Sequence, residues 1–166
     1  MLLYLMRHGL AADAAGAGPR SDAERALTAE GRVRVEKVAE ALADVGVEPG
    51  LILTSPLVRA RETAEIVGRQ FPKAKVKTTA HLAPGSAAAD LVEEAASSRA
   101  KAVLCVGHSP QLEMVVSKVC AGVEFPICEL KKAGVACLDV EGYSRRGVIR
   151  WVLPPGLVRK LRRGGG

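Results

Sequence analysis

The sequence predicts a three-layer α/β/α domain with a mostly parallel sheet and an antiparallel edge. Short apolar runs, typical of strands buried on both faces, alternate four times with segments of helical periodicity. Two strand-like segments then follow each other across a Gly-containing turn. A chain of 166 residues, 48% of them apolar, fits one such domain over residues 1–155, with a basic and flexible tail at 156–166.

The first strand and helix are separated by a long loop. Residues 2–6 are uninterrupted apolar residues, which indicates a buried strand. Residues 10–26 are rich in Ala, Gly and Asp without a sustained period, which is typical of a loop over the strand end. Thr28 is suited to cap the helix that follows, and Gly46 to end it.

A second strand and helix come next, followed by a strand of different character. Residues 51–54 predict a short buried strand. Ser55 and Pro56 then have the pattern of an N-cap and a first helical residue, which predicts a helix from there to about Gln70. Alternating residues at 75–78 suit an edge strand.

The second half of the chain repeats the pattern before ending in two strands. The second Ser-Pro pair, at Ser109 and Pro110, again predicts a helix start. The last two strands are expected to form an antiparallel hairpin at one edge of the sheet. The expected elements are a helix at 88–99, a strand at 102–107, a helix from Ser109 to about Gly122, and strands at 134–140 and 147–153.

Charge and composition argue against several classes of function. The net charge is +6, but the tail at 159–163 supplies four of these charges, so the body of the chain is only mildly basic. The tail lacks the nearby aromatic residues that stack on bases, which argues against nucleic-acid binding. No apolar run is long enough to span a bilayer and the start lacks a secretory pattern, so we expect a cytoplasmic protein without a membrane partner. The four cysteines form no C-x-x-C pair and are expected to be free thiols, mostly buried.

Three predicted strand ends share one polar character. The first strand leads into Arg7, His8 and Gly9, the second into Ser55 with Arg59 one turn later, and the fourth into His108 and Ser109. Because parallel strands end at one edge of a sheet, these residues are expected to converge. Helix N-termini and arginine side chains both bind anions. The sequence therefore predicts a pocket for a phosphoryl group.

Two histidines in such a pocket could also catalyse phosphoryl transfer. A neutral imidazole is a good nucleophile toward phosphorus and can form a covalent intermediate. A second histidine, as a cation, can hydrogen-bond the phosphoryl oxygens in the transition state. The chain contains neither a carboxylate cluster suited to Mg²⁺ nor a P-loop, so we expect a reaction without a metal or other cofactor.

Four motifs resemble the signatures of the histidine phosphatase superfamily, which has the phosphoglycerate mutase-like fold. The compact chain and its Trp151-x-x-Pro154 ending are most similar to the SixA-type phosphohistidine phosphatases within it. The motifs, which span most of the chain in order, are Leu5-Met6-Arg7-His8-Gly9, Leu27-Thr28-Ala29-Glu30-Gly31, the segment from Thr54 to Ala64, and Val106-Gly107-His108-Ser109-Pro110.

The resemblance implies a role for each matched residue. His8 would be the nucleophile, and Arg7 and Arg59 would hold the phosphoryl oxygens. His108 would be the second phosphate-binding histidine. The substrate-binding residues implied besides these four catalytic ones are Gly9, whose carbonyl would fix the tautomer of His8, and Ser109, through its backbone N–H.

Two charged residues in the third motif receive no such role. Arg61 and Glu62 read as helix-surface charges.

The sequence departs from the family pattern where many members carry a general acid. After the third predicted strand no carboxylate precedes Asp90, and His81 and Asp13 are only weak candidates for a proton donor. An alkyl phosphate needs its alkoxide leaving group protonated, whereas a phosphoramidate such as phosphohistidine can carry its proton beforehand. The missing acid therefore favours phosphohistidine as the substrate.

The leading hypothesis is a metal-independent phosphatase that acts through phospho-His8 on a phosphohistidine-bearing protein, such as a phosphotransfer domain. The short chain has no long insertion over the site, so a protein substrate could reach it. Two alternatives are a phosphomonoesterase for a small molecule such as a sugar phosphate, and a module that binds phosphoproteins without turnover. The presence of both arginines and both histidines argues against the second.

Overall fold

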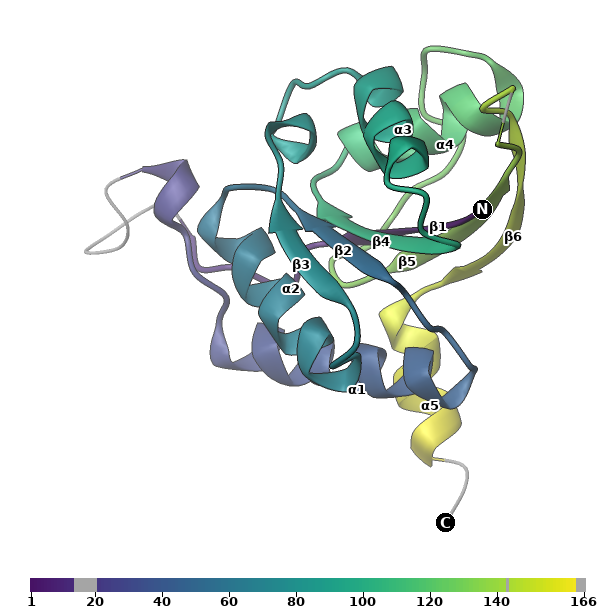
Figure 1. Cartoon of the computed structure of the whole chain (residues 1–166). Coiled ribbons are helices and arrows are strands. Elements are labelled where there is room, and N and C mark those ends of the chain that lie inside the picture. The colour runs from purple at the N-terminus through teal and green to yellow at the C-terminus, as the bar shows by residue number, and fades with distance from the viewer. Residues whose placement is uncertain (14–20, 143, 164–166) are drawn as a thin grey trace.

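The computed structural model describes residues 1–13, 21–142 and 144–163, and it has a six-stranded sheet in the order β3-β2-β4-β1-β5-β6 (Figure 1). The strands are β1 (Leu2–Arg7), β2 (Leu51–Thr54), β3 (Lys75–Thr78), β4 (Ala102–Gly107), β5 (Val135–Val140) and β6 (Gly147–Leu153). The helices are α1 (Ala29–Asp44), α2 (Val58–Gln70), α3 (Ala88–Ser97), α4 (Gln111–Ala121) and α5 (Pro155–Arg163), with short 3₁₀ turns η1 (Asp22–Glu24) and η2 (Ala80–Leu82).

The register of the sheet brings three strand ends together. β1 pairs in parallel with β4, so that Arg7 lies opposite Gly107. β4 also pairs in parallel with β2, with Thr54 opposite Val106. β5 runs antiparallel to β1, and β6 antiparallel to β5 at the edge. The mixed three-layer fold with an antiparallel edge is thus confirmed.

Each face of the sheet has its own apolar core because side chains alternate along β1. Tyr4 and Met6 pack with α1, α2 and α5, whereas Leu3 and Leu5 pack with α3 and α4. Figure 1 shows these two groups of helices on opposite sides of the sheet. Burial on both faces explains why β1 reads as an uninterrupted apolar run.

Helix α1 is held close to the segment after β1 by two glycines. Thr28 caps the helix as predicted, accepting a hydrogen bond from Gly31 N–H at 2.9 Å. A Cβ atom on Gly31 would lie 2.1 Å from the carbonyl oxygen of Leu10, and one on Gly9 would lie 2.7 Å from Cγ2 of Val35. Only glycine permits this approach, which explains the final residue of the Leu-Thr-x-x-Gly motif.

The predicted starts of two helices were wrong. Helix α2 begins at Val58 after the cap residue Leu57, and α4 begins only after Pro110. The Ser55 hydroxyl accepts a hydrogen bond from the Leu57 N–H at 3.3 Å and also contacts His108, whereas the Ser109 hydroxyl donates to Glu113. The Ser-Pro pattern therefore predicts the right turns but places both helix starts too early.

The described end of the chain differs from the flexible tail expected at 156–166, of which residues 164–166 lie outside the described part. Residues Pro155–Arg163 form α5, which packs against α1. Val158 is only 3% exposed and belongs to the core below the sheet. Burial of this apolar side chain gives the segment a fixed place despite its basic neighbours.

The four cysteines are free thiols. Cys105 and Cys137 are buried, as predicted, and Cys120 and Cys128 are half-buried.

No helix in the described part of the chain is long and apolar enough to cross a bilayer.

Candidate active site

The predicted residues converge at the carboxyl ends of β1, β2 and β4. His8 follows β1, His108 follows β4, and Arg59 lies in the first turn of α2. All three side chains are buried, and the two imidazole rings lie 5.1 Å apart between centroids. Parallel pairing of the three strands is what brings together residues as distant in sequence as His8 and His108.

The tautomer of His8 follows from its hydrogen bonds. Nδ1 lies 2.7 Å from the carbonyl oxygen of Gly9, which can only accept, so Nδ1 carries the proton. Nε2 is then unprotonated and accepts a hydrogen bond from Nε of Arg59 at 3.2 Å. The Gly9 N–H donates to Oγ1 of Thr63, whose hydroxyl donates to the carbonyl of Arg59. This arrangement directs an unprotonated nitrogen toward the Arg59 guanidinium.

Burial keeps both histidines neutral at pH 7. Desolvation is the main cause that lowers the pKa of His8 to about 3, with smaller effects from His108, Arg59 and Arg7. Desolvation and the two arginines lower the pKa of His108 to about 4. The neutral form is the nucleophilic form of His8. The cationic form expected for His108 requires an anion close enough to offset burial and the arginines.

Ser55 holds the second histidine. Its Oγ lies 2.8 Å from Nε2 of His108, and this serine is fully buried at the end of β2. Nδ1 of His108 is also buried and has no hydrogen-bond partner among the described residues. Ser55 was expected near the other polar strand ends and as a helix cap, but its contact with His108 was not predicted.

A carboxylate that sequence reasoning did not find joins the site at Arg59. The Arg59 guanidinium donates to the backbone oxygen of Asp22 at 2.6 Å and to its Oδ2 at 2.9 Å. Hydrogen bonds from Arg25 and Arg59 lower the pKa of the Asp22 carboxyl group, which keeps it ionised. Asp22 therefore orients Arg59 and is unsuited to donate a proton at neutral pH.

A buried glutamate connects Ser109 to the segment that anchors Arg7. Nη1 of Arg7 donates to the carbonyl oxygen of Leu130 at 2.8 Å. Oε1 of Glu113 accepts from the Leu130 N–H at 3.0 Å and from Oγ of Ser109 at 2.7 Å. Glu113 is only 2% exposed, so water cannot solvate its carboxylate. The two hydrogen bonds to Oε1 replace that solvation for one of its oxygens.

The expectation that Glu62 is a surface charge was wrong. Its carboxylate is partly buried, accepts a hydrogen bond from the Leu27 N–H at 2.7 Å and pairs with Arg32. These contacts connect α2 to Leu27, the first residue of the Leu27–Gly31 motif, and to Arg32 in α1. Arg61 is exposed, as predicted.

Neither weak candidate for a general acid is brought to the two histidines by a described contact. His81 lies on η2, and its Nδ1 is 3.8 Å from Oε2 of Glu94 on α3. Asp13 is exposed at the edge of the described segment. Among the described residues, no cluster of three or more His, Cys, Asp or Glu could hold a metal ion.

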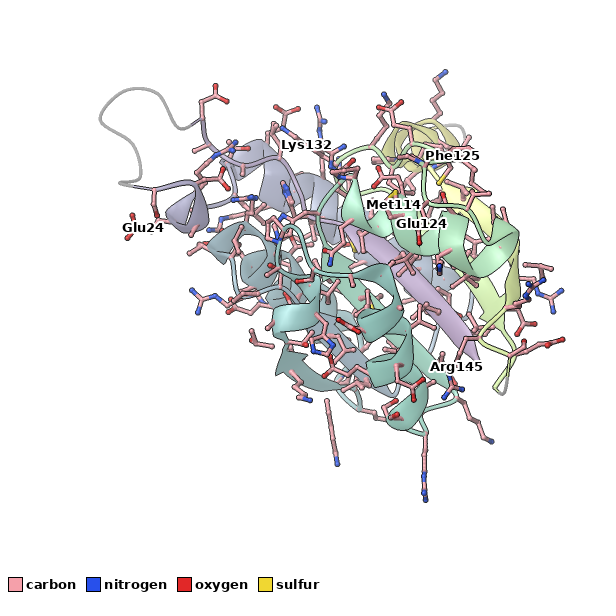
Figure 2. All side chains as sticks on the ribbon, turned by 90° about the horizontal axis from the view of Figure 1, so that it is seen from above. Glu24, Met114, Glu124, Phe125, Lys132 and Arg145 are labelled. Atoms are coloured by element: carbon pink, nitrogen blue, oxygen red, sulfur yellow. The ribbon has the colours of Figure 1, made fainter. Side chains whose placement is uncertain are left out.

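Two cavities include predicted phosphate-binding residues in their walls. The first, which we call the α1–α5 cavity, has a volume of about 700 Å³ and includes Arg7 in its wall. The second, the α4 cavity, has a volume of about 450 Å³ and is lined by His108, Ser109 and residues 84–89. Met114 and Glu124, labelled in Figure 2, also line the α4 cavity. A substrate larger than a phosphoryl group therefore has two directions in which to extend.

Both a curated relative and a solved structure that are similar to this chain are histidine-directed phosphatases by name. Phosphohistidine phosphatase SixA of Escherichia coli K12 is 30% identical over 93% of this chain and 94% of its own length. A solved structure of the protein histidine phosphatase SixA with tungstate superposes with a TM-score of 0.85, at 25% identity and with 95% and 99% of the two chains covered.

Phosphatases of other substrates share the fold. The structure of a proposed α-ribazole-5'-phosphate phosphatase from Escherichia coli superposes with a TM-score of 0.68 at 19% identity, covering 93% and 98% of the two chains. The family model of the histidine phosphatase superfamily (branch 1) matches residues 3–83, which contain His8 and Arg59. Together with the full-length similarity to a phosphohistidine phosphatase, this match shows that the chain belongs to the histidine phosphatase superfamily.

Proposed function

We propose that this phosphatase removes the phosphoryl group from phosphohistidine on a protein, through a phosphorylated His8. Nε2 of His8 attacks phosphorus, the bond from phosphorus to the substrate's ring nitrogen breaks, and its electron pair returns to that ring. Arg7, Arg59 and His108 bind the phosphoryl oxygens, assisted by the N–H of Ser109. Water then attacks phospho-His8, releasing inorganic phosphate and restoring the free imidazole.

The pairing of Asp22 with Arg59 is the observation that carries the choice of substrate. The Asp22 carboxylate is hydrogen-bonded to Arg59, and its lowered pKa makes it a poor general acid. A phosphohistidine protonated on its other ring nitrogen loses a neutral imidazole and needs no such acid. An alkyl phosphate would lose an alkoxide, which needs a proton. The similarity to SixA supports the same substrate.

The experiment compares substrates with the purified protein. We expect kcat/KM for a histidine-phosphorylated protein to exceed that for sugar phosphates and nucleotides by roughly 100-fold or more, since unassisted alkoxide departure costs general-acid catalysis. His8→Ala should abolish turnover, and His81→Ala, which removes a histidine outside the phosphate pocket, should retain it.

Three other results would each lead to a different conclusion about the function. Preference for an alkyl phosphate would identify a small-molecule phosphomonoesterase and would refute the argument from Asp22. Tight binding of the phosphoprotein without release of phosphate would identify a binding module. Full activity of His8→Ala would refute the assignment of the nucleophile.

A further inference from the structure

The α1–α5 cavity lies beside the phosphate pocket but extends well away from it. Its walls come from the first half of α1, the beginning of α5 and the segment at 131–132 that precedes β5. Lys132 of that segment is labelled in Figure 2. Arg7 belongs both to this cavity and to the set of side chains that influence the pKa of His8. A group bound in the cavity would therefore lie next to the phosphoryl group on its Arg7 side.

The cavity is strongly cationic. Its charged lining residues are five cations and one carboxylate, namely Arg7, Arg34, Lys37, Lys131, Lys132 and Glu30. Arg34 pairs with Glu30, and Lys131 pairs with Glu129. Within the described part of the chain, Lys37 and Lys132 have no ion-pair partner. Exposed pairs of this kind are weak, so both paired cations can also exchange their partners for an incoming anion.

The α4 cavity differs in charge although it adjoins the same site. Its charged lining residues are Lys118 and Glu124, which pair with each other at 3.2 Å, and His108 in its wall is neutral at pH 7. A substrate with negative charge around its phosphorylated residue would therefore be attracted to the α1–α5 side. The charge around the phosphate pocket is thus asymmetric, and this asymmetry gives a bound partner a preferred orientation.

We propose that the α1–α5 cavity is the docking surface for an acidic segment of the phosphohistidine-bearing protein, with Lys37 and Lys132 as its principal cations. The proposal rests on the proposed function. A single phosphoryl group is already provided for by Arg7 and Arg59, so the additional cations require additional anions on the substrate. They come from α1 and from the 131–132 segment, and the cavity is far larger than a phosphoryl group. Acidic side chains spread over a protein surface match this distribution.

The test uses a charge-reversed variant and a control with the same change in net charge. Lys37→Glu/Lys132→Glu reverses the two lysines of the cavity that have no ion-pair partner among the described residues. Lys75→Glu/Lys101→Glu reverses the charge of two exposed lysines at the amino ends of β3 and β4. His8 lies at the other end of the parallel strands, after the carboxyl end of β1. The substrates are a histidine-phosphorylated phosphotransfer domain of acidic net charge, and phosphoramidate as a small phosphoryl donor.

We expect the cavity variant to raise KM for the phosphorylated domain about tenfold or more, with kcat changed less than about twofold. Turnover of phosphoramidate should stay within about twofold of the wild type, and the control variant should behave as the wild type with both substrates. Raising the salt concentration should raise KM of the wild type much more than KM of the cavity variant, because ions screen the attraction.

Two results would overturn the proposal: an unchanged KM for the phosphorylated domain, or an equal loss with phosphoramidate, which would place the lysines in the phosphate pocket itself. Failure of the wild type to dephosphorylate the domain, with phosphoramidate still hydrolysed, would count against the proposed function alone. Titration of the unphosphorylated domain then decides the docking question, since binding should be present in the wild type and the control and lost in the cavity variant. Circular dichroism checks that both variants are folded.

Discussion

The Nε–H of Arg59 donates to Nε2 of His8 at 3.2 Å, so the arginine contacts the same nitrogen that would attack phosphorus. Asp22 holds the other end of this guanidinium through two further hydrogen bonds. An incoming phosphoryl group would therefore meet a donor already directed at the line of attack. When the lone pair of Nε2 turns to phosphorus, the Arg59 N–H is free to donate to a phosphoryl oxygen.

Replacement of Arg59 by lysine tests this geometry while preserving the charge. Lysine cannot place one planar group against both His8 and Asp22, so we expect kcat/KM to fall about 100-fold with little change in folding. Steady-state kinetics with the phosphorylated substrate measures the effect, and Arg61→Lys on the exposed side of α2 is the matched control. A loss of less than about threefold would show that the planar fork is not needed.

The buried histidines predict a loss of stability in mild acid. In the unfolded chain they titrate near 6.5, whereas burial lowers the pKa of His8 to about 3 and that of His108 to about 4. Between these values the unfolded state binds more protons than the folded state. Stability is therefore complete above pH 6.5 and decreases as the pH falls toward 4.

We expect each histidine to lower the free energy of unfolding by about 2 kcal/mol between pH 7 and pH 5. Urea denaturation at the two pH values measures the change. The His8→Asn and His108→Asn variants should each show a smaller difference than the wild type. Identical pH dependence in all three proteins would contradict the assignment.

The close contact between α1 and Leu10 predicts that Gly31 tolerates no side chain. Gly31→Ala would place Cβ against a backbone oxygen, and we expect a loss of stability of about 2 kcal/mol or more. Gly50→Ala is the control because its Cβ would meet only ordinary contacts, 3.7 Å away at the nearest. Thermal or urea denaturation of both variants is the measurement, and equal stability would show that α1 can move away from Leu10.

The hydrogen bonds of Glu113 predict different effects for two substitutions. Glu113→Ala leaves the buried N–H of Leu130 without an acceptor, which should cost about 1–3 kcal/mol and loosen the segment that anchors Arg7. Glu113→Gln retains an oxygen in place of Oε1 and should preserve most of the stability.

Kinetics of the same two variants separates positioning from folding. If Glu113 positions Arg7 and Ser109, the alanine variant should show a higher KM for the phosphorylated substrate even well below its melting temperature. The glutamine variant should restore the wild-type KM. A KM unaffected by either change would limit Glu113 to a purely structural role.

The convergence of the candidate site residues could be predicted because apolar strands and polar strand ends are local patterns. The step from Met6 to Arg7 and the step from Val106 to His108 are readable without knowing the fold, and parallel pairing then places them together. The capping by Thr28 was predictable for the same reason, since a cap involves residues only three apart.

The residues that were missed depend on contacts between distant segments. Asp22 reaches Arg59 only because of the path taken by a segment without periodic pattern. Glu62 looks like any polar residue of a helix until the start of α1 is placed beside it. Ser55 matches the pattern of a helix cap, and only the distant neighbour His108 shows the other use of its hydroxyl group. Val158 is buried whereas its apolar neighbour Leu157 is exposed, and this difference depends on how α5 packs against α1.

The hydrogen bond from His8 to the carbonyl of Gly9 also determines the chemical identity of the phosphorylated enzyme. With Nδ1 engaged, phosphorus can bond only to Nε2, so the trapped protein should contain tele-phosphohistidine and none of the pros isomer. Antibodies specific for each isomer, or ³¹P NMR of the denatured phosphoprotein, distinguish the two. The backbone of one glycine thus decides which of two constitutional isomers forms, although it contributes no atom to the reaction.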